Sequence, residues 1–88
     1  MRYQIGIIRK AQRQLMKLPV SAQERIAESI GMLSHNPDNP ALDVKPLKND
    51  FEARYRLRVG DYQVKFNRDD EIFIIEITRV AHRKDVYK

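Results

Sequence analysis

The chain has 88 residues, a formal net charge of +5 and a pI near 9.7, which suits one basic domain over residues 1–88 and excludes two independent folding units. It contains no cysteine and two histidines, which excludes disulfides and thiolate metal sites, and we expect no cofactor. The excess of cations favours an anionic partner such as nucleic acid.

Residues 2–8 are predicted to form the first strand, because Ile5, Ile7 and Ile8 are β-branched and Tyr3 is aromatic. This apolar run is too short for a signal peptide or a membrane span. We therefore expect a cytoplasmic protein without a membrane partner.

Two amphipathic helices are expected next. Apolar residues recur with helical spacing over residues 9–18, and Pro19 ends this helix. Ser21 and Glu24 have the spacing of a capping box at the start of a second helix, which continues to about His35. The two helices form a helical hairpin whose apolar faces we expect to cover a sheet.

Residues 36–40 are dense in turn formers and end the second helix. The following segment, up to Phe51, shows no clear period and is expected to be a loop. Lys45 and Lys48 in this loop are positioned like phosphate contacts, although solvated loop lysines are the commoner outcome.

Apolar and polar residues alternate on both sides of Gly60 and Asp61, which predicts a β-hairpin over residues 54–66 with Arg58 opposite Gln63. One face of this hairpin is apolar. The other face has no carboxylate on either strand and carries Arg54, Arg56, Arg58, Gln63 and Lys65. We interpret it as an open surface for an anionic partner, with an ordinary solvated sheet face as the alternative.

Residues 72–78 are the most apolar β run and are predicted to form an interior strand buried on both faces. Glu76 interrupts this run, either as a polar edge residue or as a base. The strand runs back toward the hairpin turn, so the tail should emerge near Arg58 and Gln63. It would bring four further candidates to the basic surface: His82, Arg83, Lys84 and Tyr87.

These side chains suit phosphoryl transfer without a metal. Arginine binds phosphate oxygens through paired hydrogen bonds and stabilises the charge that develops during attack. RNA supplies its own nucleophile, the 2′-OH, so the protein needs only to orient the phosphate and move protons. Tyr87 and His82 are candidates for the proton transfers, as is Lys65 among its neighbouring cations. Tyr87 stacking on a base, and His82 as an ordinary surface residue, are the alternatives.

The order of these elements resembles the RelE branch of the RelE/ParE toxin superfamily. The resemblance covers essentially the whole chain and rests on three motifs: Lys45-Pro46-Leu47-Lys48, the hairpin Tyr55-Arg56-Leu57-Arg58-Val59-Gly60-Asp61-Tyr62, and the terminal His82-Arg83-Lys84-Asp85-Val86-Tyr87. It implies a compact α+β fold with an N-terminal strand, a helical hairpin and a three-stranded antiparallel meander in a mainly antiparallel sheet.

The resemblance also implies the toxin of a type II toxin–antitoxin system, a ribosome-dependent endoribonuclease that cleaves mRNA in the ribosomal A site. Its implied partners are the ribosome, mRNA and a RelB-like antitoxin in a hetero-oligomeric complex. The implied catalytic residues are Arg56, Arg58, Arg83 and Tyr87. We expect RNA or ribosome contacts from Lys45, Lys48, Arg54, Gln63, Lys65, His82 and Lys84.

Two departures from the family pattern leave alternatives open. Arg56 and Arg58 stand on the first hairpin strand, where some members use lysines. Gln63 stands where the second hairpin strand usually has an arginine, so transition-state stabilisation should be weaker. One alternative is a weakened relative that only binds antitoxin or RNA. Another is a ParE-like inhibitor of DNA gyrase without catalysis, against which Arg83 and Tyr87 argue.

Overall fold

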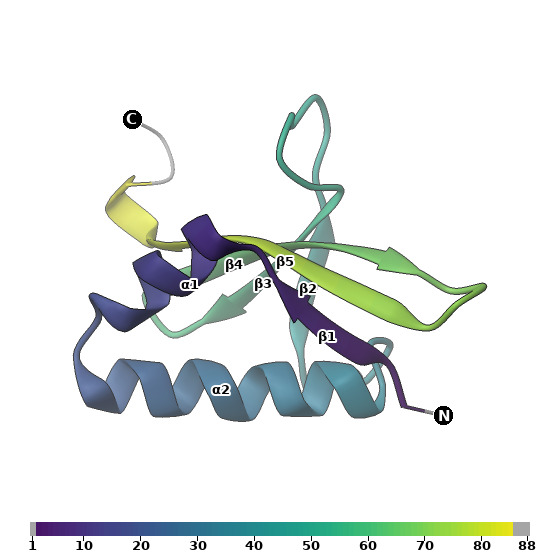
Figure 1. The fold of residues 1–88 in the computed structure, drawn as a ribbon, viewed down its shortest axis with the longest axis horizontal. Coiled ribbons are helices and arrows are strands. Elements are labelled where there is room, and N and C mark those ends of the chain that lie inside the picture. Colours follow the sequence, from purple (N-terminus) through teal and green to yellow (C-terminus); the bar gives the residue numbers. More distant parts are fainter. Residues whose placement is uncertain (1, 86–88) are drawn as a thin grey trace.

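The structure is a computed structural model that describes residues 2–85. Its elements follow in the order β1 (Gln4–Ile7), α1 (Arg9–Met16), α2 (Val20–His35), β2 (Asp43–Pro46), β3 (Tyr55–Val59), β4 (Tyr62–Asp69), β5 (Ile74–His82) and a 3₁₀ turn, η1 (Arg83–Asp85). The strands form one sheet in the order β1-β5-β4-β3-β2, in which β1 is parallel to β5 and the other neighbours are antiparallel (Figure 1). The α+β fold with a mainly antiparallel sheet is therefore confirmed.

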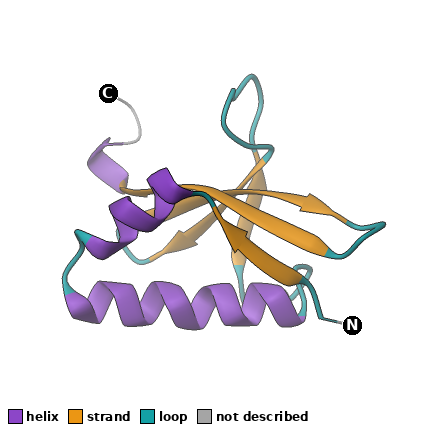
Figure 2. Ribbon diagram, viewed as in Figure 1, coloured by secondary structure: helices purple, strands orange, loops and turns teal. Residues whose placement is uncertain are grey.

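The core lies between α2 and one face of the sheet, and α1 lies beside β5 (Figure 2). Its largest fully buried side chains are Phe66, Ile26, Leu33, Leu57, Ile75, Ile77 and Val64. Burying an aliphatic or aromatic side chain of this size stabilises a fold by roughly 1.5–3 kcal/mol. The helical hairpin is thus held on the sheet by its apolar stripe, as the helical spacing predicted.

The predicted capping box is wrong. α2 begins at Val20, directly after Pro19, and no side chain caps its first turn. The side chain of Gln23 instead serves the end of α1, because its Nε2 donates to the carbonyl oxygens of Leu18 (2.8 Å) and Met16 (3.2 Å). None of the helices in residues 2–85 has the length and apolar character needed to cross a membrane.

The β3–β4 hairpin has the predicted register. Val59 lies opposite Tyr62, and Arg58 lies opposite Gln63. Gly60 has a φ of +58°, the conformation that a residue with a Cβ rarely adopts and that a two-residue hairpin turn requires. The apolar face of this hairpin therefore turns toward α2, and its polar face turns the other way.

β2 departs from the expectation of a loop over residues 43–46. The strand pairs antiparallel with β3, placing Val44 opposite Leu57 and Lys45 opposite Arg56. It is short and ends in Pro46, which an edge strand tolerates because only one of its sides is paired. Lys45 is consequently an exposed strand residue rather than a loop residue.

β5 is an interior strand, as predicted, but it is not buried on both faces. It begins at Ile74, two residues later than expected, and the side chain of Ile72 in the preceding turn is 62% exposed. Within the strand Ile75 and Ile77 are buried, whereas Glu76 is exposed. Burial alternates along this part of the strand because α2 covers one face of the sheet and leaves the other face open (Figure 1).

Candidate functional site

Cations lie in cross-strand rows on the face of the sheet opposite α2. Arg58 of β3 lies opposite Gln63 of β4, which in turn lies opposite Ala81 of β5. In the next row along the sheet, Arg56 of β3 lies opposite Lys65 of β4, which lies opposite Arg79 of β5. We call the following residues the basic face: Arg56, Arg58, Gln63, Lys65 and Arg79.

Two of these cations are buried and paired with carboxylates. Nη1 of Arg56 donates to the carbonyl oxygen and to Oδ1 of Asp43, each at 3.1 Å. Nζ of Lys65 lies 2.6 Å from Oδ2 of Asp50 and 3.3 Å from Oε1 of Glu52. The open face expected from the sequence is therefore wrong at Arg56 and Lys65, because β2 and the loop before β3 supply carboxylates that the hairpin itself lacks.

Glu52 is the centre of a small ionic network. Its Oε1 accepts a hydrogen bond from Nη1 of Arg79 at 3.0 Å, and its Oε2 lies 3.6 Å from Nζ of Lys10 on α1. Burial raises the pKa of Glu52, but the hydrogen bonds from Arg79 and Lys65 outweigh burial, so this pKa is lower than usual. Burial also raises the pKa of Asp50. Hydrogen bonds from Lys65 and from two backbone N–H groups outweigh burial, so the pKa of Asp50 is lower than usual.

Arg58 differs from its neighbours on the basic face. It is half-buried and forms no ion pair among residues 2–85. Its Nε is shielded from solvent without a hydrogen-bond acceptor in this part of the chain; the Nε of Arg79 is also without one, but Nη1 of Arg79 binds Glu52. A shielded guanidinium N–H without an acceptor is costly. An incoming phosphate oxygen would satisfy it, so Arg58 is the member of the basic face best suited to bind an anion.

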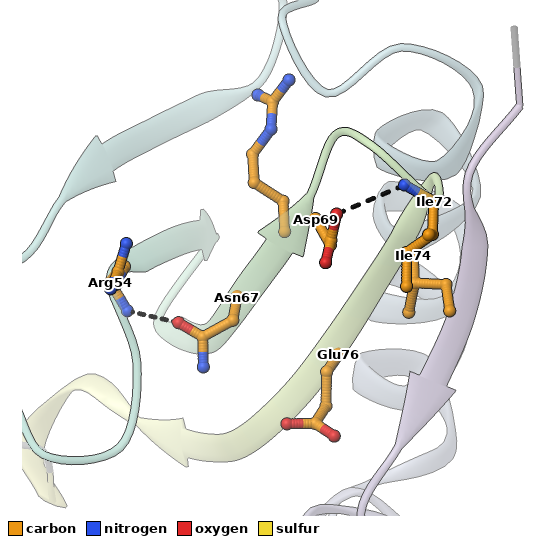
Figure 3. A pocket seen from close by; sticks show the side chains of 7 residues that line it. Arg54, Asn67, Asp69, Ile72, Ile74 and Glu76 are labelled. Atoms are coloured by element: carbon orange, nitrogen blue, oxygen red, sulfur yellow. Dashed lines mark hydrogen bonds between the residues drawn. The ribbon is translucent and has the colours of Figure 1, made fainter.

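Arg54 lies at the opposite end of β3 from the hairpin turn. Its backbone N–H donates to Oδ1 of Asn67 at 2.8 Å, and its side chain is exposed. Arg54, Asn67 and Glu76 line a hollow of about 340 Å³ on the open side of the sheet (Figure 3). The structure therefore does not bring Arg54 to the hairpin turn.

The beginning of the tail lies beside the hairpin turn, which confirms its predicted course. His82 pairs with Tyr62 across the sheet, and the N–H of Arg83 donates to the carbonyl oxygen of Asp61 at 2.6 Å. Together with Lys84, residues Asp61, His82 and Arg83 line a hollow of about 300 Å³. Arg83 and Lys84 are exposed, and Tyr87 lies outside the described residues.

His82 is held in one orientation by two contacts. Its ring meets the ring of Tyr62 edge to face, with centroids 5.4 Å apart, and its Nδ1 accepts a hydrogen bond from the N–H of Lys84 at 3.1 Å. A neutral imidazole that accepts at Nδ1 carries its proton on Nε2. In this tautomer Nε2 of His82 can donate a hydrogen bond to a ligand, while Nδ1 is already occupied by the N–H of Lys84.

Sequence reasoning missed Arg79 and the three carboxylates that neutralise the basic face. Asp43, Asp50 and Glu52 are the acidic residues that precede the hairpin most closely, and a cluster of cations without partners is a signal to search there. Arg79 had no such signal, because a bulge between Lys65 and Phe66 shifts the register of β5. The alternation read from residues 72–78 does not continue across that shift.

This fold and this face define a small α+β protein with one covered and one cationic sheet face, and comparison with known proteins identifies its family. Residues 7–87 match the model of the ParE toxin of type II toxin–antitoxin systems, parDE. The chain is 33% identical over 89 residues to Toxin RelG of Mycobacterium tuberculosis, an alignment that covers 100% of this chain and 99% of that protein.

Solved structures agree with this match. The RelBE2 toxin–antitoxin complex from Mycobacterium tuberculosis contains a chain with a TM-score of 0.80 and 31% identity, covering 94% of this chain and 100% of that one. The archaeal RelE–RelB complex from Pyrococcus horikoshii gives a TM-score of 0.80 at 26% identity, covering 98% and 100%. The chain therefore belongs to the ParE toxin family of the RelE/ParE superfamily, as a RelE-type toxin of a type II toxin–antitoxin system.

Proposed function

We propose that this toxin is a ribosome-dependent endoribonuclease that cleaves mRNA in the ribosomal A site and so inhibits translation. The observation that supports it most directly is the meeting of Arg58 and Gln63 with the first residues of the tail. Arg58 offers a shielded N–H without an acceptor among residues 2–85, and Arg83 is tied by its backbone to the hairpin turn. Donors at this end of the sheet suit a phosphodiester.

The proposed reaction is attack of a ribose 2′-oxygen on the adjacent phosphorus. The P–O5′ bond breaks, leaving a 2′,3′-cyclic phosphate on one fragment and a 5′-OH on the other. Arg58 and Arg83 stabilise the charge on the non-bridging oxygens, while Gln63 donates a neutral hydrogen bond. Arg56 is paired with Asp43 and acts mainly by holding this part of the sheet in place. No metal takes part in the proposed step.

Two proton transfers accompany this step. One removes the proton of the 2′-OH, and the other supplies a proton to the departing 5′-oxygen. Nε2 of His82 can donate a hydrogen bond to the departing 5′-oxygen, and His82 remains a candidate for either transfer. Tyr87 remains the candidate for the first transfer or for stacking on a base.

The proposed partners are a RelB-like antitoxin in a hetero-oligomeric complex, together with the ribosome and mRNA in the cytoplasm. The similar solved structures from Mycobacterium tuberculosis and Pyrococcus horikoshii are complexes of RelE-type toxins with RelB-type antitoxins, which supports the first partner. The positive charge of the chain supports the other two, because ribosomal RNA and mRNA are polyanions.

Primer extension on an abundant translated mRNA after induction of the toxin in a bacterial host tests this proposal. We expect cuts confined to translated regions, because the A site supplies the substrate. Arg83→Ala should reduce cutting by roughly 100-fold or more, the effect of losing one charge-stabilising donor. Arg13→Ala is the matched control, since Arg13 is exposed on α1 and is not part of the basic face, and it should cut like the wild type.

Inhibition of DNA gyrase is the second candidate, favoured by the match to a family model described as the ParE toxin. Growth arrest without mRNA cuts, together with loss of gyrase supercoiling activity in the presence of the purified toxin, would support it and contradict the nuclease. If neither activity appears, Gln63→Arg tests for a weakened site. That substitution should restore cutting if the missing charge is the cause.

A further inference from the structure

We propose that Phe51 stacks on an unpaired base of the RNA that this toxin binds, an inference that rests on the proposed function. Phe51 lies in the loop between β2 and β3, which stands away from the sheet (Figure 1). Its relative exposure is 106%, compared with 74% for Met16, the next most exposed large hydrophobic residue of residues 2–85. The whole ring is therefore free to contact a partner.

The residues around Phe51 hold the loop in one shape. The N–H of Leu47 donates to the carbonyl oxygen of Arg54 at 2.7 Å and closes the base of the loop. Oδ1 of Asp50 accepts the N–H groups of Glu52 (2.8 Å) and Ala53 (3.1 Å), which forms a tight turn directly around Phe51.

The ionic network fixes this turn to the sheet. The carboxylates on both sides of Phe51 bind Lys65, and Glu52 also binds Arg79. Asp50 and Glu52 thus point toward the sheet, while the ring between them is fully exposed. A ring presented on a fixed loop loses little conformational entropy on binding, which is the condition for an effective stacking platform.

The charges near the loop favour RNA over an apolar protein groove. Lys48 lies three residues before Phe51 and Arg54 three residues after it, and both side chains are exposed. An exposed aromatic ring flanked by cations matches the pattern by which proteins bind single-stranded nucleic acid, with the ring on a base and the cations on phosphates. Lys65 and Arg79 then act as positioning residues for Phe51 through Asp50 and Glu52.

Tryptophan fluorescence provides a direct test, because the chain contains no tryptophan. Phe51→Trp places the single indole at the loop tip, and Met16→Trp places it at the exposed end of α1 as the matched control. The probe is a short single-stranded RNA of mixed sequence at low salt, with its binding followed independently by the anisotropy of a label on the RNA. We expect RNA binding to quench the indole of the Phe51→Trp variant and to leave that of the Met16→Trp variant unquenched.

Affinity gives the second readout. Phe51→Ala should weaken RNA binding by roughly 5- to 100-fold, whereas Phe51→Tyr should bind like the wild type. RNA binding without quenching in Phe51→Trp, or with unchanged affinity in Phe51→Ala, would overturn the proposal. If the fluorescence of Phe51→Trp responds to a purified RelB-type antitoxin but not to RNA, the proposal is overturned in favour of a protein contact.

These outcomes do not depend on cleavage. Quenching by RNA in a chain that leaves mRNA intact would retain the stacking residue and reject the nuclease. If Phe51→Ala cuts mRNA at the wild-type rate and RNA does not quench Phe51→Trp, the nuclease is retained and the stacking residue is rejected.

Discussion

Lys65 illustrates how burial decides what a cation does. Its side chain is 9% exposed and lies within hydrogen-bond distance of Asp50 and Glu52. Removing one member of a buried ion pair leaves the other charge without compensation. We expect Lys65→Met to lower the free energy of unfolding by about 3 kcal/mol, measured by urea denaturation, because the carboxylate of Asp50 loses its cation.

Two further variants separate this explanation from others. Lys65→Met combined with Asp50→Asn should be less destabilised than the sum of the single changes, because both charges are removed together. Arg54→Met, at an exposed cation, should change stability by less than about 0.5 kcal/mol. If Lys65→Met folds as stably as the wild type but no longer binds ribosomes, Lys65 is a phosphate ligand instead.

For individual residues, the sequence predicted which cations share a face of the hairpin. It did not predict which of these cations are paired with carboxylates. The alternation around Gly60 determines that Arg56, Arg58, Gln63 and Lys65 point the same way, and the structure has that register. The neutralising carboxylates come from other segments. Their positions depend on how the chain returns to the sheet, which a period-two pattern does not contain.

The loop between β2 and β3 contributes stability that should depend on pH. Asp50 and Glu52 have pKa values lowered from 3.8 and 4.5, so they stabilise the fold above those values. This stabilisation is lost as the pH falls through the still lower folded-state pKa values. We expect the free energy of unfolding to decrease from about pH 5 downward, measured by urea denaturation at a series of pH values.

The contribution of this loop is isolated by comparison with Glu52→Gln. Other carboxyls with lowered pKa values, such as Asp38 and Asp43, give a decrease of the same sign in both proteins. The variant should be less stable at neutral pH and should show a shallower decrease in acid. Parallel curves for the two proteins would show that Glu52 does not gain from its contacts with Lys10, Lys65 and Arg79.

β2 shows why an element can escape sequence reasoning. Four residues that include one proline carry too little periodicity to be distinguished from loop, and the strand forms because β3 offers it an open edge. By contrast, the helices and the β3–β4 hairpin carry their own signals in apolar spacing and in Gly60. Elements with local signals were predicted, and elements that depend on a neighbour were not.

At the scale of the whole molecule, the net charge of +5 is distributed unevenly. Arg56, Lys65 and Arg79 of the basic face are paired with carboxylates, as is Arg68 at the far end of β4. Exposed cations of β2, the loops and the tail lie outside this paired centre: Lys45, Lys48, Arg54, Arg83 and Lys84. Further exposed cations lie on the two helices and at the end of α1: Arg9, Lys10, Arg13, Lys17 and Arg25. A polyanion would therefore be attracted first by the exposed cations at the rim of the basic face. Within the basic face, Arg58 is the cation without a carboxylate partner among residues 2–85 and can bind a phosphate.

This distribution predicts which variants alter the salt dependence of ribosome binding. Each phosphate contact contributes about −0.7 to −0.9 to the slope of log K against log salt concentration. Lys48→Ala should make the slope less negative by about that amount, because Lys48 is exposed in the loop between β2 and β3. Lys65→Met should leave the slope unchanged under conditions in which it remains folded, because its charge is already balanced by Asp50 and Glu52. Arg13→Ala on α1 serves as the control for net charge, and equal slopes for Lys48→Ala and Arg13→Ala would show that binding senses total charge rather than this rim.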